Sequence, residues 1–241
     1  MREENFKGKT ILVIGAHPDD NDFGAGATVA KAAKQGAKII YIVATLGQRG
    51  SSDSRITPDD LAKIRTAEQV AASKVLGVKK VIFLGYCDGE LDPNLELKEK
   101  IVKLIRKYKP DIVITMDPSK FYYKEYGFIN HSDHRAIGEA TLDAAYPLAR
   151  DLLSFPEHKK EGLAPHKVKE LWMPSFLPED ANHFIDVTQT FEIKIRALAR
   201  HKTQIGNVPE MKTRMQGRAE VLGKKIGVKL AEGFIRLKLP K

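Results

Sequence analysis

The chain alternates short apolar runs with longer amphipathic segments of helical period. The apolar runs lack the polar–apolar alternation of half-exposed strands, so they predict strands that are buried on both faces of a parallel sheet. These runs are residues 10–16, 38–45, 80–84 and 111–116. The helical segments are residues 24–36, 59–76, 97–108 and about 132–149. This order predicts an α/β fold with a Rossmann-like, mostly parallel sheet and helices on both of its faces.

Beyond residue 151 the pattern is less regular, but it still predicts regular elements. They are strands at residues 168–174 and 183–186 and helices at residues 190–201 and 210–225. Nothing in the composition marks a linker, a repeat or a low-complexity segment. We therefore expect a single domain over residues 1–241, with a core at about 9–150 and a C-terminal extension at 151–241.

Polar side chains gather where two predicted strands end. The first strand is followed by Gly15-Ala16-His17-Pro18-Asp19-Asp20, where a nucleotide-binding fold would have Gly-x-Gly-x-x-Gly. A long loop after the fourth strand leads to His131 and His134, which lie one turn apart at the start of a predicted helix. In an open parallel sheet the ligand site lies at the carboxyl ends of the strands, so we expect the two clusters to meet there.

Together, His17, Asp20 and His134 offer two imidazole nitrogens and one carboxylate. A catalytic zinc ion takes three such protein ligands and keeps a fourth position open for water. The metal lowers the pKa of that water from about 15.7 to about 7 and polarises a carbonyl group. We therefore predict one Zn²⁺ per chain, although iron, cobalt and manganese also accept this set of ligands.

Three further polar side chains remain for proton transfer. Asp19 can take the proton of the attacking water as a general base. His131 can stabilise an oxyanion or protonate a leaving amine. Asp133 can hydrogen-bond a ring nitrogen of His131 and fix its tautomer. These roles predict a metal-dependent hydrolase that cleaves an amide bond.

The same residues resemble the motifs of a known family. His17-Pro18-Asp19-Asp20 with His131-x-Asp133-His134 is similar to the LmbE-like, or PIG-L, family of zinc-dependent N-acetylglucosamine deacetylases. The resemblance covers most of residues 9–150. Its further blocks, in order, are Thr45-Leu46-Gly47, Arg65-x-x-Glu68, Leu76-Gly77-Val78, Leu84-Gly85 and Asp88-Gly89.

The resemblance implies a role for each matching residue. It makes His17, Asp20 and His134 the zinc ligands. It makes Asp19 the general base, His131 the transition-state stabiliser or acid, and Asp133 the partner of that histidine. Arg65 matches an arginine that holds substrate hydroxyls or the carboxylates of the site, and its alternative is an ordinary arginine on a helix surface.

Within the family the chain is most similar to the archaeal diacetylchitobiose deacetylases, which act on chitin-derived disaccharides. Residues 22–28 and 129–134 carry this likeness, and His201-Lys202-Thr203-Gln204 resembles a His-x-Ser-Gln block. The expected reaction removes the N-acetyl group from an N-acetylglucosamine-containing mono- or disaccharide and releases acetate. Enzymes of the bacillithiol pathway are also similar, so N-acetylglucosaminyl malate is the alternative substrate.

The loop at residues 121–128 is rich in aromatic side chains. Aromatic faces pack on the apolar faces of sugar rings, and the alternative is a contact between subunits. Some relatives have a tyrosine where this chain has Ile129. Either a tyrosine of the loop at residues 121–128 reaches the site instead, or this chain uses no tyrosine there. We therefore predict Arg65, Tyr122, Tyr126 and His201 as substrate-binding residues.

A net charge of +9 is compatible with binding to nucleic acid. Lysines are interleaved with glutamates on nearly every predicted helix, which is typical of a solvated surface. A non-catalytic Rossmann-type binding protein is the alternative from another class. It would leave Asp19, Asp20 and Asp133 unexplained, because carboxylates repel phosphate. We therefore expect a small acetylated amino sugar as the partner and no nucleic acid.

The chain has a single cysteine, Cys87, which excludes an internal disulfide and a thiolate-rich zinc site. Its first residues are polar, and no apolar run approaches the roughly 20 residues that span a bilayer. We therefore expect a cytoplasmic protein without membrane association. The resemblance also implies a homo-oligomer, because related enzymes are often hexamers.

Overall fold

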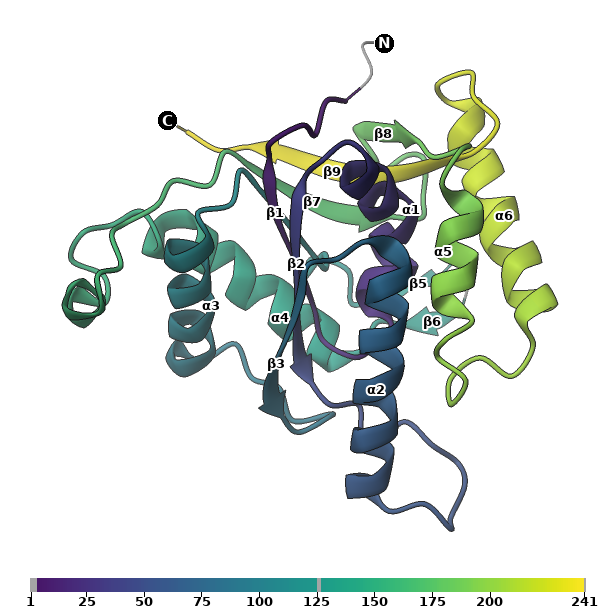
Figure 1. The fold of residues 1–241 in the computed structure, drawn as a ribbon, viewed down its shortest axis with the longest axis horizontal. Helices are drawn as coiled ribbons and strands as arrows, with labels where there is room; N and C mark the ends of the chain where they lie inside the picture. Colours follow the sequence, from purple (N-terminus) through teal and green to yellow (C-terminus); the bar gives the residue numbers. More distant parts are fainter. Residues whose placement is uncertain (1–3, 125–126, 241) are drawn as a thin grey trace.

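A seven-stranded sheet forms the centre of the computed structural model, which describes residues 4–124 and 127–240 (Figure 1). Its strands are β1 (Thr10–Gly15), β2 (Lys38–Thr45), β3 (Lys80–Tyr86), β4 (Ile112–Thr115), β7 (Glu170–Ser175), β8 (His183–Asp186) and β9 (Ala231–Lys238). Their order is β3-β2-β1-β4-β7-β9-β8. The first five strands in that order are parallel, and β9 is antiparallel to both of its neighbours. The predicted α/β fold with a mostly parallel sheet is confirmed.

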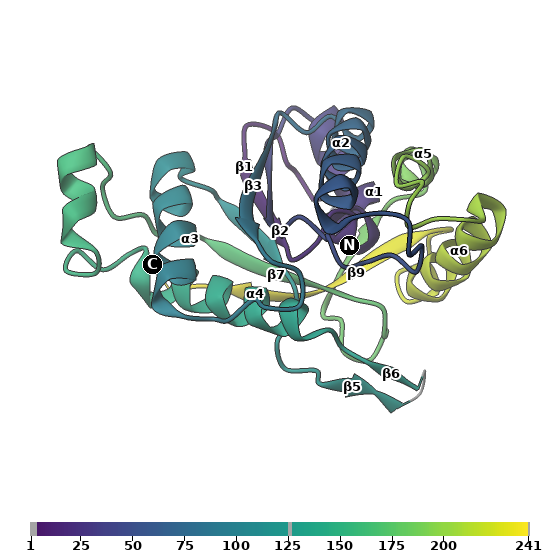
Figure 2. The same ribbon diagram turned by 90° about the horizontal axis from the view of Figure 1, so that it is seen from below.

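Helices cover both faces of the sheet (Figures 1 and 2). They are α1 (Asp20–Lys34), α2 (Pro58–Leu76), α3 (Leu95–Tyr108), α4 (Ser132–Asp143), α5 (Phe191–Leu198) and α6 (Val208–Lys224), with a π-helical turn at Ala144–Leu148 and a 3₁₀ helix at Pro156–Glu161. None of the helices in the described ranges is long and apolar enough to cross a membrane.

Strand β1 shows how the sequence builds two cores. Ile11 and Val13 face one core with the apolar residues of α1, α2, α5 and α6. Leu12 and Ile14 face the other core with those of α3 and α4. All four side chains are buried, because successive residues of a strand point to opposite faces of the sheet. The continuous apolar run therefore follows from a strand that is covered on both sides.

Three parts of the fold differ from the sequence prediction. Residues 231–238 form β9, a strand that the hydrophobic pattern did not predict, and it lies between β7 and β8. Within the predicted loop after β4, β5 (Tyr122–Tyr123) and β6 (Phe128–Ile129) pair as a hairpin that projects from the body (Figure 2). The predicted helix at residues 24–36 begins earlier, at Asp20.

The order of the strands places the site. Strand β1 lies between β2 and β4, so the chain leaves β1 and β4 toward opposite faces of the sheet. Such a switch in strand order opens a crevice at the carboxyl ends of the two strands, where ligands bind in open α/β sheets. The segments that follow β1 and β4 carry the two predicted clusters.

A buried ion pair between α5 and β9 makes hydrogen bonds to the backbone of α1. Lys194 Nζ lies 2.6 Å from Glu232 Oε1 and donates to the Phe23 carbonyl at 2.7 Å. Glu232 accepts the backbone N–H groups of Ala27 and Thr28 at 3.1 and 2.7 Å. The pair therefore provides hydrogen-bond partners for backbone groups of α1 between Phe23 and Thr28.

Replacing Lys194 by methionine should lower the free energy of unfolding by about 3 kcal/mol, because it leaves Glu232 charged, buried and unpaired. Urea denaturation measures this loss. The matched control is Lys212→Met, which breaks an exposed ion pair with Glu192 and should cost no more than about 1 kcal/mol. Equal losses in the two variants would contradict the structural importance of the buried pair.

Candidate active site

The turn between β1 and α1 is shaped by Asp20. The Asp20 carboxylate accepts the backbone N–H groups of Ala16 at 3.1 Å and His17 at 2.7 Å. Asp19, which precedes it, has a φ of 108° and lies in the region that favours glycine. A residue held there stores about 1–3 kcal/mol of strain, so neighbouring groups must stabilise it. The turn is therefore built to present specific side chains at the sheet edge.

Three predicted metal ligands meet in this crevice. The Nδ1 atom of His17 lies 3.3 Å from Asp20 Oδ2 and 3.3 Å from His134 Nε2. His134 Nε2 also lies 3.1 Å from Asp20 Oδ1. One ligand atom from each residue lies within 4.8 Å of the other two. Asn130 Oδ1 lies 3.1 Å from His134 Nδ1, so it orients this ring from outside the cluster.

The donor set fits a divalent cation. The two ring nitrogens lie 3.3 Å apart, and a carboxylate oxygen lies 3.1 Å from one of them, so each can offer a lone pair to a cation when these nitrogens carry no proton. Two histidines and one carboxylate are a ligand set of catalytic zinc sites. The described residues thus bring together the three side chains that the sequence analysis selected from segments more than a hundred residues apart.

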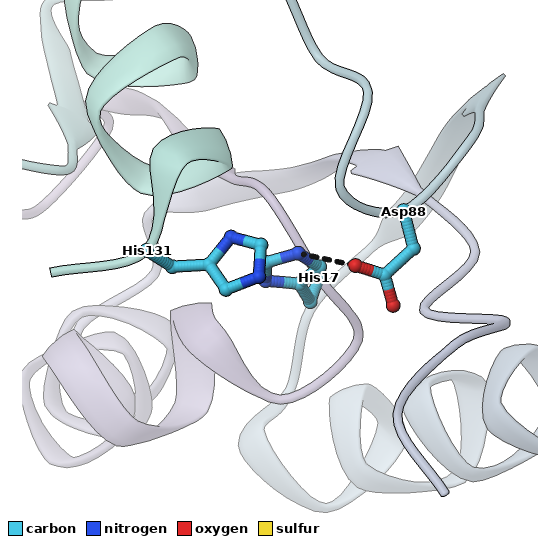
Figure 3. Close-up of side chains that lie close together, drawn as sticks. All are labelled: His17, Asp88 and His131. Carbon is cyan, nitrogen blue, oxygen red and sulfur yellow. Dashed lines mark ion pairs between the residues drawn. The ribbon is translucent and has the colours of Figure 1, made fainter. Parts of the chain in front are cut away.

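The opposite edge of His17 faces two further carboxylates. Its Nε2 atom lies 3.2 Å from Asp133 Oδ2 and 3.2 Å from Asp88 Oδ1. Figure 3 shows the His17 ring between His131 and Asp88. Burial lowers the pKa of His17, but the attraction of Asp20 and the hydrogen bonds to carboxylates outweigh it and raise the pKa to about 12. The pocket around this ring therefore stabilises positive charge, from a proton or from a metal ion.

The position of Asp133 differs from the sequence prediction. Its carboxylate contacts His17 and accepts the backbone N–H groups of Gly89 at 2.7 Å and Leu91 at 3.2 Å. Its backbone N–H, and not its carboxylate, contacts the His131 ring, with Nδ1 as acceptor at 3.2 Å. The predicted pairing of the Asp133 carboxylate with the ring is corrected accordingly: Asp133 orients His17 instead.

The contact of His131 with the backbone fixes its tautomer. A backbone N–H can only donate, so the Nδ1 atom of a neutral His131 ring must accept and the ring proton lies on Nε2. Burial and the neighbouring His17 lower the pKa of His131, which favours this neutral form. Its ring centroid lies 4.7 Å from that of His17. An exposed His131 can thus offer an N–H donor to a substrate oxygen beside the cluster.

Asp19 lies beside the cluster and is clamped by Arg65. The guanidinium donates from Nη2 to the Pro18 carbonyl at 2.7 Å and from Nη1 to the Gly47 carbonyl at 2.9 Å. The same Nη2 lies 3.5 Å from Asp19 Oδ2. Burial and the Asp20 charge raise the pKa of Asp19 to about 7, although Arg65 opposes the shift. A carboxyl group with such a pKa can exchange a proton near neutral pH.

Arg65 is buried, so its place in the structure favours the role of holding the carboxylates of the site over an ordinary surface arginine. Gly47 and Gly50 leave room for it. A Cβ atom on Gly47 would lie 2.3 Å from Arg65 Nη1, and Gly47 has a φ of +63°. The glycine in the Thr45-Leu46-Gly47 block is therefore explained by the close approach of this arginine.

The other predicted substrate-binding residues have different outcomes. His201 is fully buried and its Nε2 lies 2.7 Å from Asp22 Oδ2, so this arrangement leaves it no contact with substrate and the prediction is corrected. Tyr122 is 65% exposed on the β5–β6 hairpin, where it pairs with Ile129. Tyr126 lies outside the described residues. Asp88, which was noted only as part of a motif, lies against His17.

The chain is similar to known deacetylases in sequence. The family model described as GlcNAc-PI de-N-acetylase, PIG-L, matches residues 12–145. The diacetylchitobiose deacetylase of Thermococcus kodakarensis is 31% identical over 81% of this chain and 70% of its own length. A probable N-acetyl-alpha-D-glucosaminyl L-malate deacetylase 2 of Bacillus subtilis is 25% identical over 88% of this chain and 91% of its own.

A solved structure is also similar over nearly the whole chain. The N,N'-diacetylchitobiose deacetylase from Pyrococcus horikoshii, in complex with its inhibitor MPG, superposes with a TM-score of 0.87 at 29% identity. The match covers 95% of this chain and 84% of that one. The fold and the site thus define a metal-dependent enzyme that removes N-acetyl groups. The chain belongs to the PIG-L family of de-N-acetylases.

Proposed function

We propose that this protein is a zinc-dependent hydrolase that removes the N-acetyl group from a chitin-derived mono- or disaccharide of N-acetylglucosamine. The observation that carries the proposal is the convergence of His17, Asp20 and His134 beside Asp19 at the carboxyl edge of the sheet. The likeness to two diacetylchitobiose deacetylases supports the choice of sugar. Water adds its oxygen to the acetyl carbon, the C–N bond breaks, and acetate and a free amino sugar leave.

In this proposal His17, Asp20 and His134 would hold the zinc ion. When bound, zinc supplies a water of lowered pKa and polarises the acetyl carbonyl. Asp88 and Asp133 face the far nitrogen of His17, and Asn130 faces that of His134. Such partners fix the orientation of ligand rings and raise their basicity. The chain thus supplies both the ligands and the residues that orient them.

The remaining groups move protons. Asp19 takes the proton from the attacking water, and Arg65 holds the Asp19 carboxylate near the cluster. The Nε2–H of His131 donates to the acetyl oxygen as negative charge develops on it, because the backbone of Asp133 keeps the proton on that nitrogen. The proton that Asp19 has taken is then available for the leaving amine.

Acetate release from a panel of N-acetylated sugars tests the proposal. The panel holds N-acetylglucosamine, diacetylchitobiose and N-acetylglucosaminyl malate, each with and without chelator, with metal analysis of the purified protein. Release from the chitin-derived sugars that stops with chelator and returns with zinc is the expected result. Release from none of the panel, together with no bound metal, would overturn it.

The alternative substrate is the malate conjugate. The Bacillus subtilis relative, which is matched over most of its length, favours this candidate. The same ligands and the same base would serve both reactions, because the bond that breaks is the same amide. Preference within the panel, expressed as a ratio of kcat/KM values, decides between the two substrates.

Three finer features belong to the same proposal. Zinc is the metal we expect in the purified protein, and elemental analysis distinguishes it from iron, cobalt and manganese. We further propose a cytoplasmic enzyme, given its single cysteine. A homo-oligomer, a hexamer by analogy with relatives, is the expected assembly, and light scattering tests it.

The value of kcat/KM should fall as the pH drops through the pKa of Asp19. The base acts only when it is ionised, and its pKa is about 7 before the charge of a bound cation is added. A cation beside it favours the ionised form, so we expect the acid limb at or below pH 7. Rates measured at saturating zinc separate this effect from metal loss. A profile without an acid limb in the range where the enzyme keeps its metal would contradict this role.

A further inference from the structure

The backbone of Asp19 is held by a side chain that no catalytic role has yet explained. The Asp19 N–H donates to Gln69 Oε1 at 2.8 Å. Gln69 lies on α2, one turn beyond Arg65, and is fully buried. Two residues one turn apart on the same helix therefore hold the Pro18–Asp19 segment. Arg65 contacts the Pro18 carbonyl and the Asp19 carboxylate, and Gln69 accepts the Asp19 N–H.

The direction of the Gln69 amide is fixed by its neighbours. The Asp19 N–H can only donate, so the oxygen of the Gln69 amide must face it. The amide nitrogen then faces Asp22 Oδ2 at 3.1 Å and Ser73 Oγ at 3.2 Å. A reversed amide would place two donors together and an oxygen against a carboxylate. The observed orientation is thus the only one that satisfies every partner.

The network continues to the C-terminal part of the chain. Asp22 accepts from Gln69 and lies 2.7 Å from His201 Nε2 through the same oxygen. Gln69, Asp22 and His201 are all 0% exposed. A polar network without access to water gains strength from the low local dielectric and has few other conformations. Asp22 thereby joins the start of α1 to Gln69 of α2 and to His201, which follows α5.

Asp19 needs this support because its backbone is strained. Its φ of 108° is one of three positive φ values among the described residues other than glycine. Strained backbone persists at functional sites only where surrounding contacts determine it. Without the acceptor at its N–H, we expect the Asp19 peptide to rotate toward a relaxed conformation, which would move the carboxylate relative to the ligand cluster.

We infer that Gln69 is a positioning residue of the deacetylase site, which holds Asp19 in its strained conformation through the amide oxygen and is itself held by Asp22 and His201. The inference rests on the proposed role of Asp19 as the general base. It predicts that the geometry of the base depends on a buried network behind the site, and not on Arg65 alone.

The test compares Gln69→Leu, which removes the acceptor with little change in volume, with the native protein. We expect kcat to fall about 10- to 100-fold, because Asp19 is no longer held in its strained conformation. The value of KM should change little, and the metal content should stay complete. The matched control is Ser73→Ala, which removes another partner of the same amide but no contact with Asp19, and it should retain native turnover.

A double-mutant cycle separates positioning from general damage. If Gln69 acts through Asp19, Gln69→Leu should cause no further loss in an Asp19→Ala background. An equal loss in both backgrounds, or full turnover of Gln69→Leu, would overturn the inference. Native turnover of Asp19→Ala alone would instead exclude Asp19 as the base, whereas the absence of acetate release by the native protein would overturn the proposed function, so the failures are distinguishable. If the leucine variant does not fold, Gln69→Met, which also removes the acceptor, takes its place in the same cycle.

Discussion

Replacing Asp19 by alanine should lower kcat by about 10²- to 10⁴-fold while the protein keeps its metal. Asp19 lies outside the group of three ligand atoms but beside it, with its carboxylate 3.5 Å from Arg65 Nη2. The variant therefore loses the proton acceptor and leaves the proposed ligands in place. Steady-state kinetics with the preferred sugar and metal analysis of the same sample measure both quantities.

The control for this change is Asp143→Ala, which removes an exposed carboxylate of α4 that pairs with Lys98 and should leave turnover unchanged. Asp19→Asn adds a second comparison, because it keeps the volume of the side chain and removes only its basicity. Native turnover of either Asp19 variant would exclude this residue as the base. Loss of metal from both would instead reassign Asp19 to the ligands.

The second large effect is expected for His134→Ala, which should lose bound metal and, with it, nearly all activity. The ring supplies one of three ligand atoms, and its removal leaves only His17 and Asp20. Three protein ligands are the usual number in a catalytic zinc site, so a site with two should exchange its metal readily. Equilibrium dialysis against zinc, followed by elemental analysis, gives the change in affinity.

The matched control is His166→Ala. The native His166 ring contacts the Pro110 carbonyl at 2.7 Å, and among the described residues it belongs to no group that could hold a metal. This variant should keep native metal content. Full occupancy of His134→Ala would show that the ligand set is misassigned. The alternative group of His17, Asp88 and His131 would then be the one to test.

The meeting of the three proposed ligands could be predicted because the segments that carry them follow strands of one parallel sheet, directly after β1 and through a long loop after β4. His17 and Asp20 follow β1 directly, and His134 lies in the first turn of a helix. A parallel sheet aligns these ends at one edge, whatever the details of the loops. The convergence of the three side chains at one edge therefore follows from the order of strands and helices along the chain.

The partner of Asp133 could not be predicted in the same way. Residues two apart at the start of a helix do not face each other, so its carboxylate points away from the His131 ring. It meets the loop after β3 instead, at the backbone of Gly89 and Leu91. That loop has no spacing rule that links it to the helix, and this contact depends on tertiary packing alone.

The C-terminal part was the hardest to interpret for a related reason. Strand β9 contains Glu232, and a carboxylate interrupts the apolar pattern that marks a buried strand. Its burial becomes favourable only through Lys194, which lies on another element. The family-like block at His201 similarly predicts a contact with substrate. In the structure the partner of His201 is Asp22, a buried residue of the first helix.

The ion pair of Lys194 with Glu232 also has a consequence for the order in which the chain matures. Chains fold largely from the N-terminus as they leave the ribosome. The segment that carries His17, Asp19 and Asp20 emerges before the groups that complete its helix, which come from positions 194, 201 and 232. A nascent chain that stops near residue 145 therefore has the ligands of the site in its sequence without the frame that holds them. Firm metal binding should then arise only after β9 has been synthesised and has inserted between β7 and β8.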